Sequence, residues 1–421
     1  MQKCWYYFTF LALRAYKHEE KTMLIGIVGK PNVGKSTFFK AATLAEVEIA
    51  NYPFATIKPN SGVGYVKVKD VAREFGKVSN PRNGYVVKEF RFVPVQLLDV
   101  AGLVPGAHQG LGMGNQFLDD LRQADALIHV IDVSGSTNEK GEVVEAGSHD
   151  PLEDVLFLEV ELDFWYLGII QKGWDKFART VMQEKIEIQK ALAKQLSGLK
   201  VTEAMIEEAI EKLALDKEKP NTWSESDLKK VAVYLRKKTK PMLIACNKAD
   251  VPTAAGNLER LREQFSEYLF IPCSAEAEIA LREAARTGLI EYVPGEKSFT
   301  IIQEDKLNEK QKKALQFIQQ KILNVYNSTG VQDALDSAVF KLLQYLAIFP
   351  GGVSKLEDKD GNVLPDCFLL PPKSTALDFA YKLHTDLGKN FICAKDVRTK
   401  KTVGKDYALK HLDVLEIVSG K

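Results

Sequence analysis

The chain has 421 residues, of which 45% are hydrophobic and 27% are charged, and its formal net charge is +1. This length favours two to four domains, and the composition is that of a soluble globular protein with sizeable cores. A net charge near zero excludes a strong overall field for nucleic acid or membranes, so any such binding must come from a local patch.

The first 22 residues differ from the rest of the chain. An apolar run at Cys4–Leu13 superficially resembles a signal peptide, but ten residues are too few to cross a bilayer, and Arg14 ends the run. We interpret residues 1–22 as an upstream extension that is not native, with Met23 as the natural start. A genuine amphipathic arm and a targeting segment are the alternatives.

Short apolar stretches that end in polar residues follow along the chain. They are predicted as strands at Leu24–Val28, Val93–Asp99, Ala126–Val133, Met242–Cys246 and Phe270–Pro272, and Thr37–Ala45 is predicted as a helix. Strands of this kind, separated by helices, predict an α/β fold with a parallel, doubly wound sheet. Ligands bind such sheets at the carboxyl ends of the strands.

Residues 137–240 form a long insertion between the third and fourth of these strands. Asp150 before Pro151 is typical of a helix start, and Ser224 with Asp227 gives a similar signal. Apolar residues recur at three- and four-residue spacing, so we expect a helical, coiled-coil-like arm. A solvated helical decoration without a role of its own is the alternative.

The C-terminal part changes character after a helical stretch at Glu304–Tyr345. Pro350 and the two glycines after it break the pattern, and a small α+β domain is predicted to follow. Its helix has a capping box at Thr375 and Asp378 and is expected to end at Gly388. The strands are predicted at Asp366–Leu370, Asn390–Ala394, Thr402–Val403 and Val414–Val418.

The first predicted strand runs into a complete phosphate-binding loop of the form G-x-x-x-x-G-K-[ST]. Its residues are Gly29, Lys30, Pro31, Asn32, Val33, Gly34, Lys35 and Ser36, followed by Thr37. Glycines let backbone N–H groups surround a phosphate, and the following helix adds its positive N-terminal end. Lys35 is expected to reach the β- and γ-phosphates, and Ser36 to bind Mg²⁺.

The other nucleotide motifs follow in the order of a GTPase. Asp99 to Gly102 has the form D-x-x-G after a strand, so Asp99 is expected to hold Mg²⁺ through a water and the Gly102 N–H to sense the γ-phosphate. Thr56 lies between this motif and the phosphate loop and is the best candidate for a second Mg²⁺ ligand. A threonine without a role in the site is the alternative. The glycine-rich stretch after Gly102 is typical of a loop that changes state on hydrolysis.

The base-reading motif N-K-x-D ends the fourth predicted strand, with Asn247, Lys248 and Asp250. The Asp250 carboxylate can accept hydrogen bonds from guanine N1–H and the exocyclic amine, a donor pair that adenine lacks. After the fifth strand come Ser274 and Ala275, and the Ala275 N–H can bond guanine O6. The motifs together predict a Mg²⁺-dependent nucleoside triphosphatase that prefers GTP.

These residues, with Asn51–Pro59 and Gly102–Leu118, resemble the Obg-like superfamily of P-loop GTPases and specifically its YchF branch. The resemblance covers the chain from Met23 onward and implies a coiled-coil arm and a C-terminal TGS domain of the β-grasp type. The domains expected are an extension at 1–22, a G domain at 23–136 and 241–303, an inserted helical domain at 137–240, a helical linker at 304–345 and a TGS domain at 346–421.

Two points separate this chain from parts of that family. Many YchF proteins have an altered base-reading motif and prefer ATP, whereas Asn247 and Asp250 are intact here. Leu103 stands where Ras-like GTPases place a water-orienting glutamine, so catalysis must use another group. Backbone donors, K⁺ held at Asn32, and His108 as a water-polarising base are the options. An ordinary loop histidine is the alternative for His108.

The function expected is a GTP-hydrolysing switch that acts with the ribosome or other RNA, as the resemblance implies. An ATP-hydrolysing regulator of the YchF type and a nucleotide-gated scaffold with negligible turnover are the alternatives. Lys395, Arg398, Lys400, Lys401 and Lys405 form a basic stretch that could follow RNA phosphates or be a solvated surface. Five cysteines without a C-x-x-C pair favour a reduced, cytoplasmic protein; no membrane partner and a monomer are expected.

Overall fold

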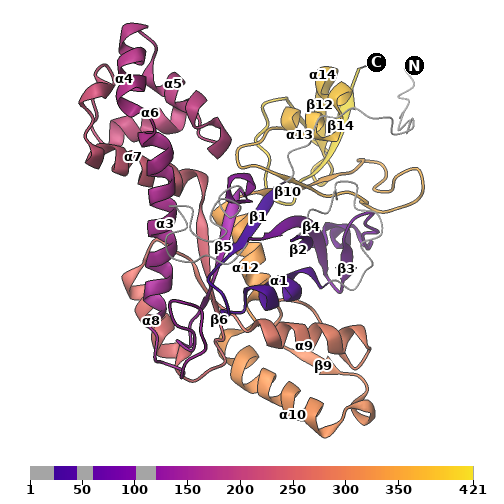
Figure 1. The fold of residues 1–421 in the computed structure, drawn as a ribbon. Helices are drawn as coiled ribbons and strands as arrows, with labels where there is room; N and C mark the ends of the chain where they lie inside the picture. Colours follow the sequence, from indigo (N-terminus) through magenta and orange to yellow (C-terminus); the bar gives the residue numbers. More distant parts are fainter. Residues whose placement is uncertain (1–22, 45–59, 101–119, 421) are drawn as a thin grey trace, which may run out of the picture. The chain divides into compact units, whose positions relative to one another are not determined.

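The computed structural model describes residues 23–44, 60–100 and 120–420, and these residues form two compact units. The first contains residues 24–66 and 95–343, and the second contains residues 67–94 and 344–420. Residues 1–22, Thr56, Gly102, Leu103 and His108 lie outside the described residues, so their predicted roles stay predictions. Figure 1 shows the elements of each unit.

A seven-stranded sheet, most of whose residues belong to the larger unit, has the order β2-β4-β1-β5-β6-β7 with β3 paired to β4. Its strands are β1 (Leu24–Val28), β2 (Ser61–Lys69), β3 (Tyr85–Val87), β4 (Phe90–Asp99), β5 (Ala126–Asp132), β6 (Met242–Asn247) and β7 (Phe270–Pro272). The five strands predicted from the sequence are confirmed. The pairs β1–β4, β1–β5, β5–β6 and β6–β7 are parallel, as a doubly wound sheet requires.

The register of these strands places the nucleotide motifs at one edge of the sheet. Ile27 pairs with Asp99, and Asp132 pairs with Asn247, so the carboxyl ends of β1, β4, β5 and β6 meet there. Most residues of these strands are apolar, and β5 is buried along its whole length. A buried strand can expose polar groups only at its end, which is why the sequence changes from apolar to polar there.

Helices of the larger unit pack beside this sheet and carry the segments that follow each motif. They are α1 (Lys35–Thr43), α8 (Ala254–Gln264), α9 (Ala275–Arg286) and α12 (Val331–Asp336). The helix α1 packs against both α9 and α12, and its buried face contains Phe38, Ala41 and Ala42. The phosphate loop is therefore followed by a helix that is fixed in the core.

The helical arm is built from residues 151–239. Its helices are α3 (Pro151–Gln171), α4 (Trp174–Gln183), α5 (Ile188–Gln195), α6 (Glu203–Lys212) and α7 (Glu225–Thr239). The helix starts predicted at Asp150 and Ser224 are confirmed, because the Asp150 side chain accepts from Leu152 N–H and Ser224 forms a capping box with Asp227. In Figure 1, α3 is a long rod that reaches the other arm helices at one end.

Two contacts hold the arm together. The rings of Trp174 and Trp223 stack with 5.4 Å between their centroids, which closes the apolar core of the arm. The buried guanidinium of Arg236 on α7 donates to Glu159 and Asp163 on α3, over 3.0 and 2.8 Å. The helices α3 and α7 are thus joined by apolar packing and by charge.

Residues 290–342 complete the larger unit with a two-stranded sheet and further helices. These elements are β8 (Ile290–Tyr292), β9 (Phe299–Ile301), α10 (Glu309–Ile318) and α11 (Asn324–Tyr326), with π-helical turns at Gln319–Leu323 and Ser337–Leu342. The helical stretch expected at Glu304–Tyr345 is confirmed, but it is divided into several helices. Asn327 and Gly330 both adopt a positive φ, at 65° and 81°, and these residues separate α11 from α12.

The smaller unit contains a five-stranded sheet with the order β11-β10-β14-β12-β13. Its elements are β10 (Leu346–Pro350), β11 (Phe368–Leu370), α13 (Ala376–Leu383), α14 (Thr385–Lys389), β12 (Phe391–Asp396), β13 (Thr402–Val403) and β14 (Val414–Ser419). The capping box at Thr375 is confirmed. Gly388 does not end α13 but lies within α14, where an added Cβ would lie 2.3 Å from the Tyr381 ring.

Residues 67–94 belong to this smaller unit and are joined to it by hydrogen bonds. Asn80 N–H donates to the Val363 carbonyl and Arg82 N–H to the Pro365 carbonyl, over 2.9 and 3.0 Å. The buried Arg91 donates to the carbonyls of Leu364 and Pro365 and lies over the Phe349 ring, 5.4 Å from its centroid. The strands β2 and β4 therefore each have residues in both units.

Among the helices of the described residues, none combines the length and the hydropathy that crossing a membrane requires.

Candidate functional site

The phosphate loop has the backbone shape that anion binding needs. Gly34 precedes α1 with a φ of 90°, a conformation that other residues rarely adopt, and no side chain caps the helix there. An added Cβ at Gly34 would lie 2.2 Å from the Asn247 side-chain nitrogen. The first N–H groups of α1 are therefore left for an anion, in the geometry of a phosphate site.

Lys35 and Asp99 meet at the centre of the site. The Lys35 ammonium lies 2.5 Å from Asp99 Oδ1, and their side chains are 11% and 20% exposed. Ser36 is the next residue of α1. This pair fits a Mg²⁺–triphosphate group, since the lysine supplies a cation for phosphate oxygens and the carboxylate supplies an acceptor for the metal or its waters.

Asn247 connects the base-reading motif to the phosphate loop. Its side-chain nitrogen donates to the Val33 carbonyl over 2.9 Å, and its side-chain oxygen accepts from the Ala275 N–H over 3.1 Å. The Ala275 N–H that was predicted to read guanine O6 thus has a protein acceptor in this structure. Ser274 is buried beside it, with its N–H bonded to the Thr329 carbonyl.

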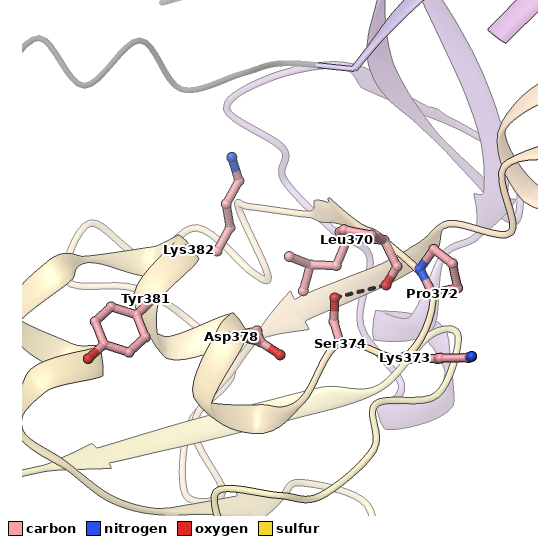
Figure 2. Close-up of a pocket in the computed structure, with 8 residues that line it drawn as sticks. Leu370, Pro372, Lys373, Ser374, Asp378, Tyr381 and Lys382 are labelled. Carbon is pink, nitrogen blue, oxygen red and sulfur yellow. Dashed lines mark hydrogen bonds between the residues drawn. The ribbon is translucent and has the colours of Figure 1, made fainter. Parts of the chain in front are cut away.

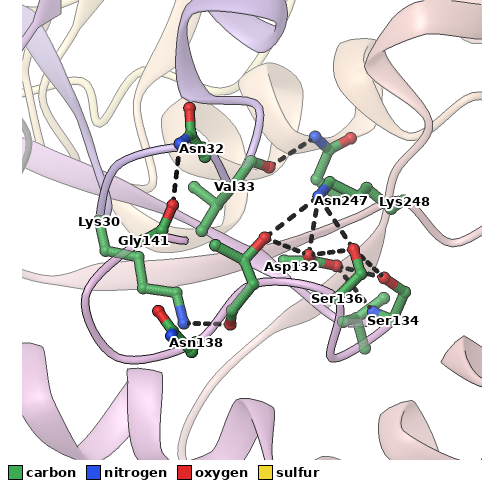
Figure 3. Close-up of polar contacts among 12 residues, drawn as sticks. Lys30, Asn32, Val33, Asp132, Ser134, Ser136, Asn138, Gly141, Asn247 and Lys248 are labelled. Carbon is green, nitrogen blue, oxygen red and sulfur yellow. Dashed lines mark hydrogen bonds and ion pairs between the residues drawn. The ribbon is translucent and has the colours of Figure 1, made fainter. Parts of the chain in front are cut away.

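Lys248 lies in a left-handed conformation and turns its ammonium toward β5 (Figure 3). It lies 2.7 Å from Asp132 Oδ2, and the hydroxyls of Ser136 and Thr137 also donate to that carboxylate, over 2.7 and 2.6 Å. Burial alone would raise the pKa of Asp132, but the bonds from Lys248 and the hydroxyls lower it below its usual value. A permanent carboxylate therefore orients the lysine of the base motif.

The other base residue, Asp250, is partly exposed in the turn after β6. Tyr326 lies close to it: its hydroxyl donates to the Ala249 carbonyl over 3.1 Å. Burial, followed by the charge of Asp250, raises the pKa of Tyr326. Tyr326 is a neighbour of the base site that the sequence did not point out, because it lies about 76 residues downstream with no motif around it.

The described site residues therefore converge at one end of the sheet. The structure brings together Lys35 with Asp99, the loop from Gly29 to Ser36 with Asn247, and Asn247 with Ala275. Asp132 is a further member that sequence reasoning missed. Its signal was available, because it is a charged residue at the end of a buried apolar strand.

The comparisons with known proteins agree with this arrangement. Family models match residues 24–158 as a "50S ribosome-binding GTPase", residues 245–352 as an "Obg-like GTPase YGR210-like, G4 motif-containing domain" and residues 358–419 as a TGS domain. An uncharacterised GTP-binding protein of Methanocaldococcus jannaschii is 50% identical over 94% of this chain and 99% of its own length. This chain belongs to the Obg-like P-loop GTPases.

Other relatives extend the comparison. An uncharacterised GTP-binding protein of Schizosaccharomyces pombe is 34% identical over 85% of this chain and 88% of its own length. A protein of Bacillus subtilis named "Ribosome-binding ATPase YchF" is 34% identical over 61% of this chain and 66% of its own length. The names of the relatives thus differ in the nucleotide that they give.

Two solved structures have the same architecture. A GTP-binding protein from Pyrococcus horikoshii superposes with a TM-score of 0.75, at 41% identity, over 94% of this chain and all of that one. The S. pombe YchF GTPase superposes with a TM-score of 0.58 at 20% identity, over 94% of this chain and 98% of that one, which shows the shared fold.

The TGS domain carries an open cavity of about 520 Å³ (Figure 2). Tyr381, Lys373 and Lys382 line it, together with Asp378 and the stretch Leu370–Ser374. In the predicted basic stretch, Arg398 donates to Glu74 from two nitrogens, over 2.6 and 3.1 Å. Arg398 is therefore held within the smaller unit by an ion pair.

Proposed function

We propose that this protein is a Mg²⁺-dependent GTPase whose nucleotide state controls binding to the ribosome or to other RNA in the cytoplasm. The observation that carries the nucleotide part is the meeting of Lys35, Asp99 and Asn247 at one edge of the sheet, with 2.5 Å between Lys35 Nζ and Asp99 Oδ1 and 2.9 Å between Asn247 Nδ2 and the Val33 oxygen. Phosphoryl transfer asks the protein mainly for positioning and charge stabilisation.

Each residue of the site has one role in this proposal. Lys35 would leave Asp99 for the β- and γ-phosphates, and the N–H groups at the start of α1 would bind the β-phosphate. Ser36, Asp99 and, from the sequence, Thr56 would hold Mg²⁺, which neutralises phosphate charge when bound. The Gly102 N–H would sense the γ-phosphate. Backbone donors, K⁺ and His108 remain the candidates for the group that activates water, as in the prediction from the sequence.

Guanine preference rests on Asp250, supported by Asn247 and Lys248. A carboxylate at the base edge accepts from two guanine donors, while adenine would leave it facing a lone pair. An unpaired buried acceptor costs on the order of 1–3 kcal/mol. The competing function, ATP hydrolysis, is favoured by the name of the B. subtilis relative.

K⁺ is a second cofactor that we include in the proposal. The amide nitrogen of Asn32 donates to the Gly141 carbonyl over 2.8 Å, and only an NH₂ group can make that bond. Because the nitrogen makes this bond, the amide oxygen of Asn32 is the atom that would bind a monovalent cation beside the phosphates. Such a cation supplies charge that an arginine finger gives in other GTPases.

The RNA part of the proposal rests on the TGS domain. Tyr381 is 48% exposed and packs against Gly388, and Lys373 and Lys382 line the same cavity. An aromatic ring beside basic side chains is typical of surfaces that stack unpaired bases. We place the partner at this domain and at the helical arm, with the protein acting as a monomer.

Parallel titrations with fluorescent GTP and ATP analogues, followed by turnover measurements with and without ribosomes, test the proposal. We expect GTP to bind at least tenfold more tightly and ribosomes to co-sediment with the GTP-analogue form more than with the GDP form. Tighter ATP binding would favour the ATPase alternative. Binding without turnover in either condition would favour the nucleotide-gated scaffold.

A further inference from the structure

Lys30, the second residue of the phosphate loop, turns its side chain away from the phosphate site and into the protein. Its ammonium lies 2.6 Å from Asp154 Oδ1 and donates to the Thr137 carbonyl over 2.8 Å. The two charged side chains are only 4% and 5% exposed, so the ion pair is dry. Figure 3 shows the lysine reaching this carbonyl.

Asp154 has few other bonds that could replace this one. His149 Nε2 lies 2.8 Å from the same oxygen, while Oδ2 is buried without a hydrogen-bond partner among the described residues. Burial raises the pKa of the Asp154 carboxyl, and Lys30 and His149 oppose that change. The carboxylate and Lys30 therefore depend strongly on each other.

A second contact lies on the same side of the loop. Asn32 donates to the Gly141 carbonyl, and Gly141 has a φ of 81°; an added Cβ there would lie 2.8 Å from Pro31 Cβ. Residues 30–32 of the loop are thus fixed from outside by the segment 137–154. This leaves the inner side, with its N–H groups, for the nucleotide.

Asp154 stands in the first turn of α3, the 21-residue helix that leads into the arm. At a rise of 1.5 Å per residue, this helix is about 31 Å long. Its far half is fixed to α7 through Asp163 and Arg236, 2.8 Å apart. One rigid element therefore joins the arm to a residue that contacts the phosphate loop.

We propose that Asp154 is a positioning residue for the nucleotide site: by holding Lys30, it keeps the backbone of the phosphate loop in its binding geometry and couples α3 to the bound nucleotide. The inference rests on the proposed function only in requiring that a nucleoside triphosphate binds; it holds for ATP as for GTP, because the loop contacts phosphates. By thermodynamic linkage, the nucleotide must then stabilise the start of α3.

The test uses Asp154→Asn, which keeps the shape and removes the charge, in the full-length protein. The matched control is Asp163→Asn, which removes a carboxylate from the same helix but on the side of α7. We expect Asp154→Asn to weaken binding of fluorescent GTP, GDP or ATP analogues at least tenfold at a temperature well below its melting transition. The control should lower the melting temperature and leave the affinity within about twofold.

Two further measurements separate positioning from loss of folding. Nucleotide should slow hydrogen exchange in the first turns of α3 in the wild type and in Asp163→Asn, but not in Asp154→Asn. The double variant Lys30→Met/Asp154→Leu removes both charges, so it should regain stability relative to Asp154→Asn. Equal nucleotide affinity and equal protection of α3 in Asp154→Asn and the wild type would overturn the inference. A wild type that binds neither GTP nor ATP would overturn the proposed function as well.

Discussion

The side-chain nitrogen of Asn247 lies 2.9 Å from the carbonyl oxygen of Val33, 214 positions earlier in the chain. This bond fixes the distance between the residues that read the base and the loop that holds the phosphates. Because both lie at the carboxyl ends of strands of the same sheet, a nucleotide has to match both at once.

Lys35→Ala should abolish triphosphate hydrolysis and leave the fold intact. The variant removes the cation at the phosphates and frees Asp99, which is 20% exposed and can be hydrated. A loss of at least 100-fold in kcat/KM is expected, about 3 kcal/mol of transition-state stabilisation. Phosphate release, with circular dichroism as the folding control, measures it; turnover at the wild-type rate would refute the assignment of the loop.

The Ser36→Ala variant removes a proposed ligand of Mg²⁺. In the same phosphate-release assay, its rate of hydrolysis should no longer depend on the Mg²⁺ concentration.

Asp250→Asn should change the base that is accepted. The variant replaces one of the two carboxylate oxygens by an NH₂ group that donates, so guanine keeps at most one of its two hydrogen bonds to this side chain and faces a donor with its exocyclic amine. Xanthine carries a carbonyl where guanine carries the exocyclic amine. We therefore expect the affinity for GTP to fall at least tenfold and the affinity for xanthosine triphosphate to rise at least tenfold. Competition titrations with the two nucleotides decide it. Unchanged guanine affinity would mean that another group reads the base.

K⁺ should stimulate GTP hydrolysis relative to Na⁺ at equal ionic strength. The effect should disappear in Asn32→Ala, because the variant removes the amide oxygen that would bind the cation. A stimulation of at least tenfold, or about 1.4 kcal/mol, is expected for a charge placed beside the phosphates. Equal rates in the two salts would exclude the cation and leave backbone donors or His108 as the remaining options.

His129 should make the protein sensitive to mild acid. It is buried in β5, and burial, with a smaller contribution from the charge of Lys30, lowers its pKa to about 3. The folded state then binds fewer protons than the unfolded state below pH 6.5, so stability is lost as the pH falls. Between pH 7 and pH 5 this amounts to about 2 kcal/mol.

His129→Leu removes that contribution and should flatten the dependence of the unfolding free energy on pH by the same amount. His129 and Asp154 line one small cavity, and Asp154 titrates in the opposite sense, so the comparison is made between variant and wild type at each pH. Urea unfolding at pH 5 and pH 7 gives the four values needed. Parallel pH profiles in the two proteins would show that His129 is not responsible.

Arg91→Met should destabilise the smaller unit. Arg91 is 1% exposed and donates to the carbonyls of Leu364 and Pro365, which the variant leaves buried and unpaired. A loss of about 2–4 kcal/mol is expected. Arg82→Met is the control, since Arg82 is 38% exposed and its ion pairs with Asp358 and Asp366 contribute at most about 1 kcal/mol. A smaller effect for Arg91 than for Arg82 would contradict this ranking.

Much of the larger unit could be predicted from the sequence. β1 begins and ends where its apolar run begins and ends, because a strand buried on both faces needs an uninterrupted apolar stretch. Strand β2 was missed, since Gly62 and Gly64 interrupt its pattern. Those glycines are required by close packing: an added Cβ at Gly64 would lie 2.6 Å from the Leu97 side chain. The local sequence pattern cannot show that Leu97, more than thirty residues later in the chain, packs against this glycine.

The candidate site could be predicted where a motif names its residues and not where tertiary contact creates the role. Lys35, Asp99 and Asn247 were identified because their spacing is fixed by the nucleotide. Asp132 and Asp154 support the lysines of two motifs, but each is an ordinary acidic residue in the sequence. Only the fold places them within hydrogen-bond distance of Lys248 and Lys30.

The pairing of Arg91 with Leu364 also has a consequence for how the protein is made. The two residues are 273 positions apart. At about 5–20 residues per second, a ribosome needs roughly 14–55 seconds to synthesise the intervening chain. The guanidinium of Arg91 therefore remains hydrated until the carbonyls of Leu364 and Pro365 have been synthesised. A segment made in the first quarter of translation completes its folding only when the last quarter has emerged. A chain whose synthesis stops early therefore contains this N-terminal segment but cannot fold it completely.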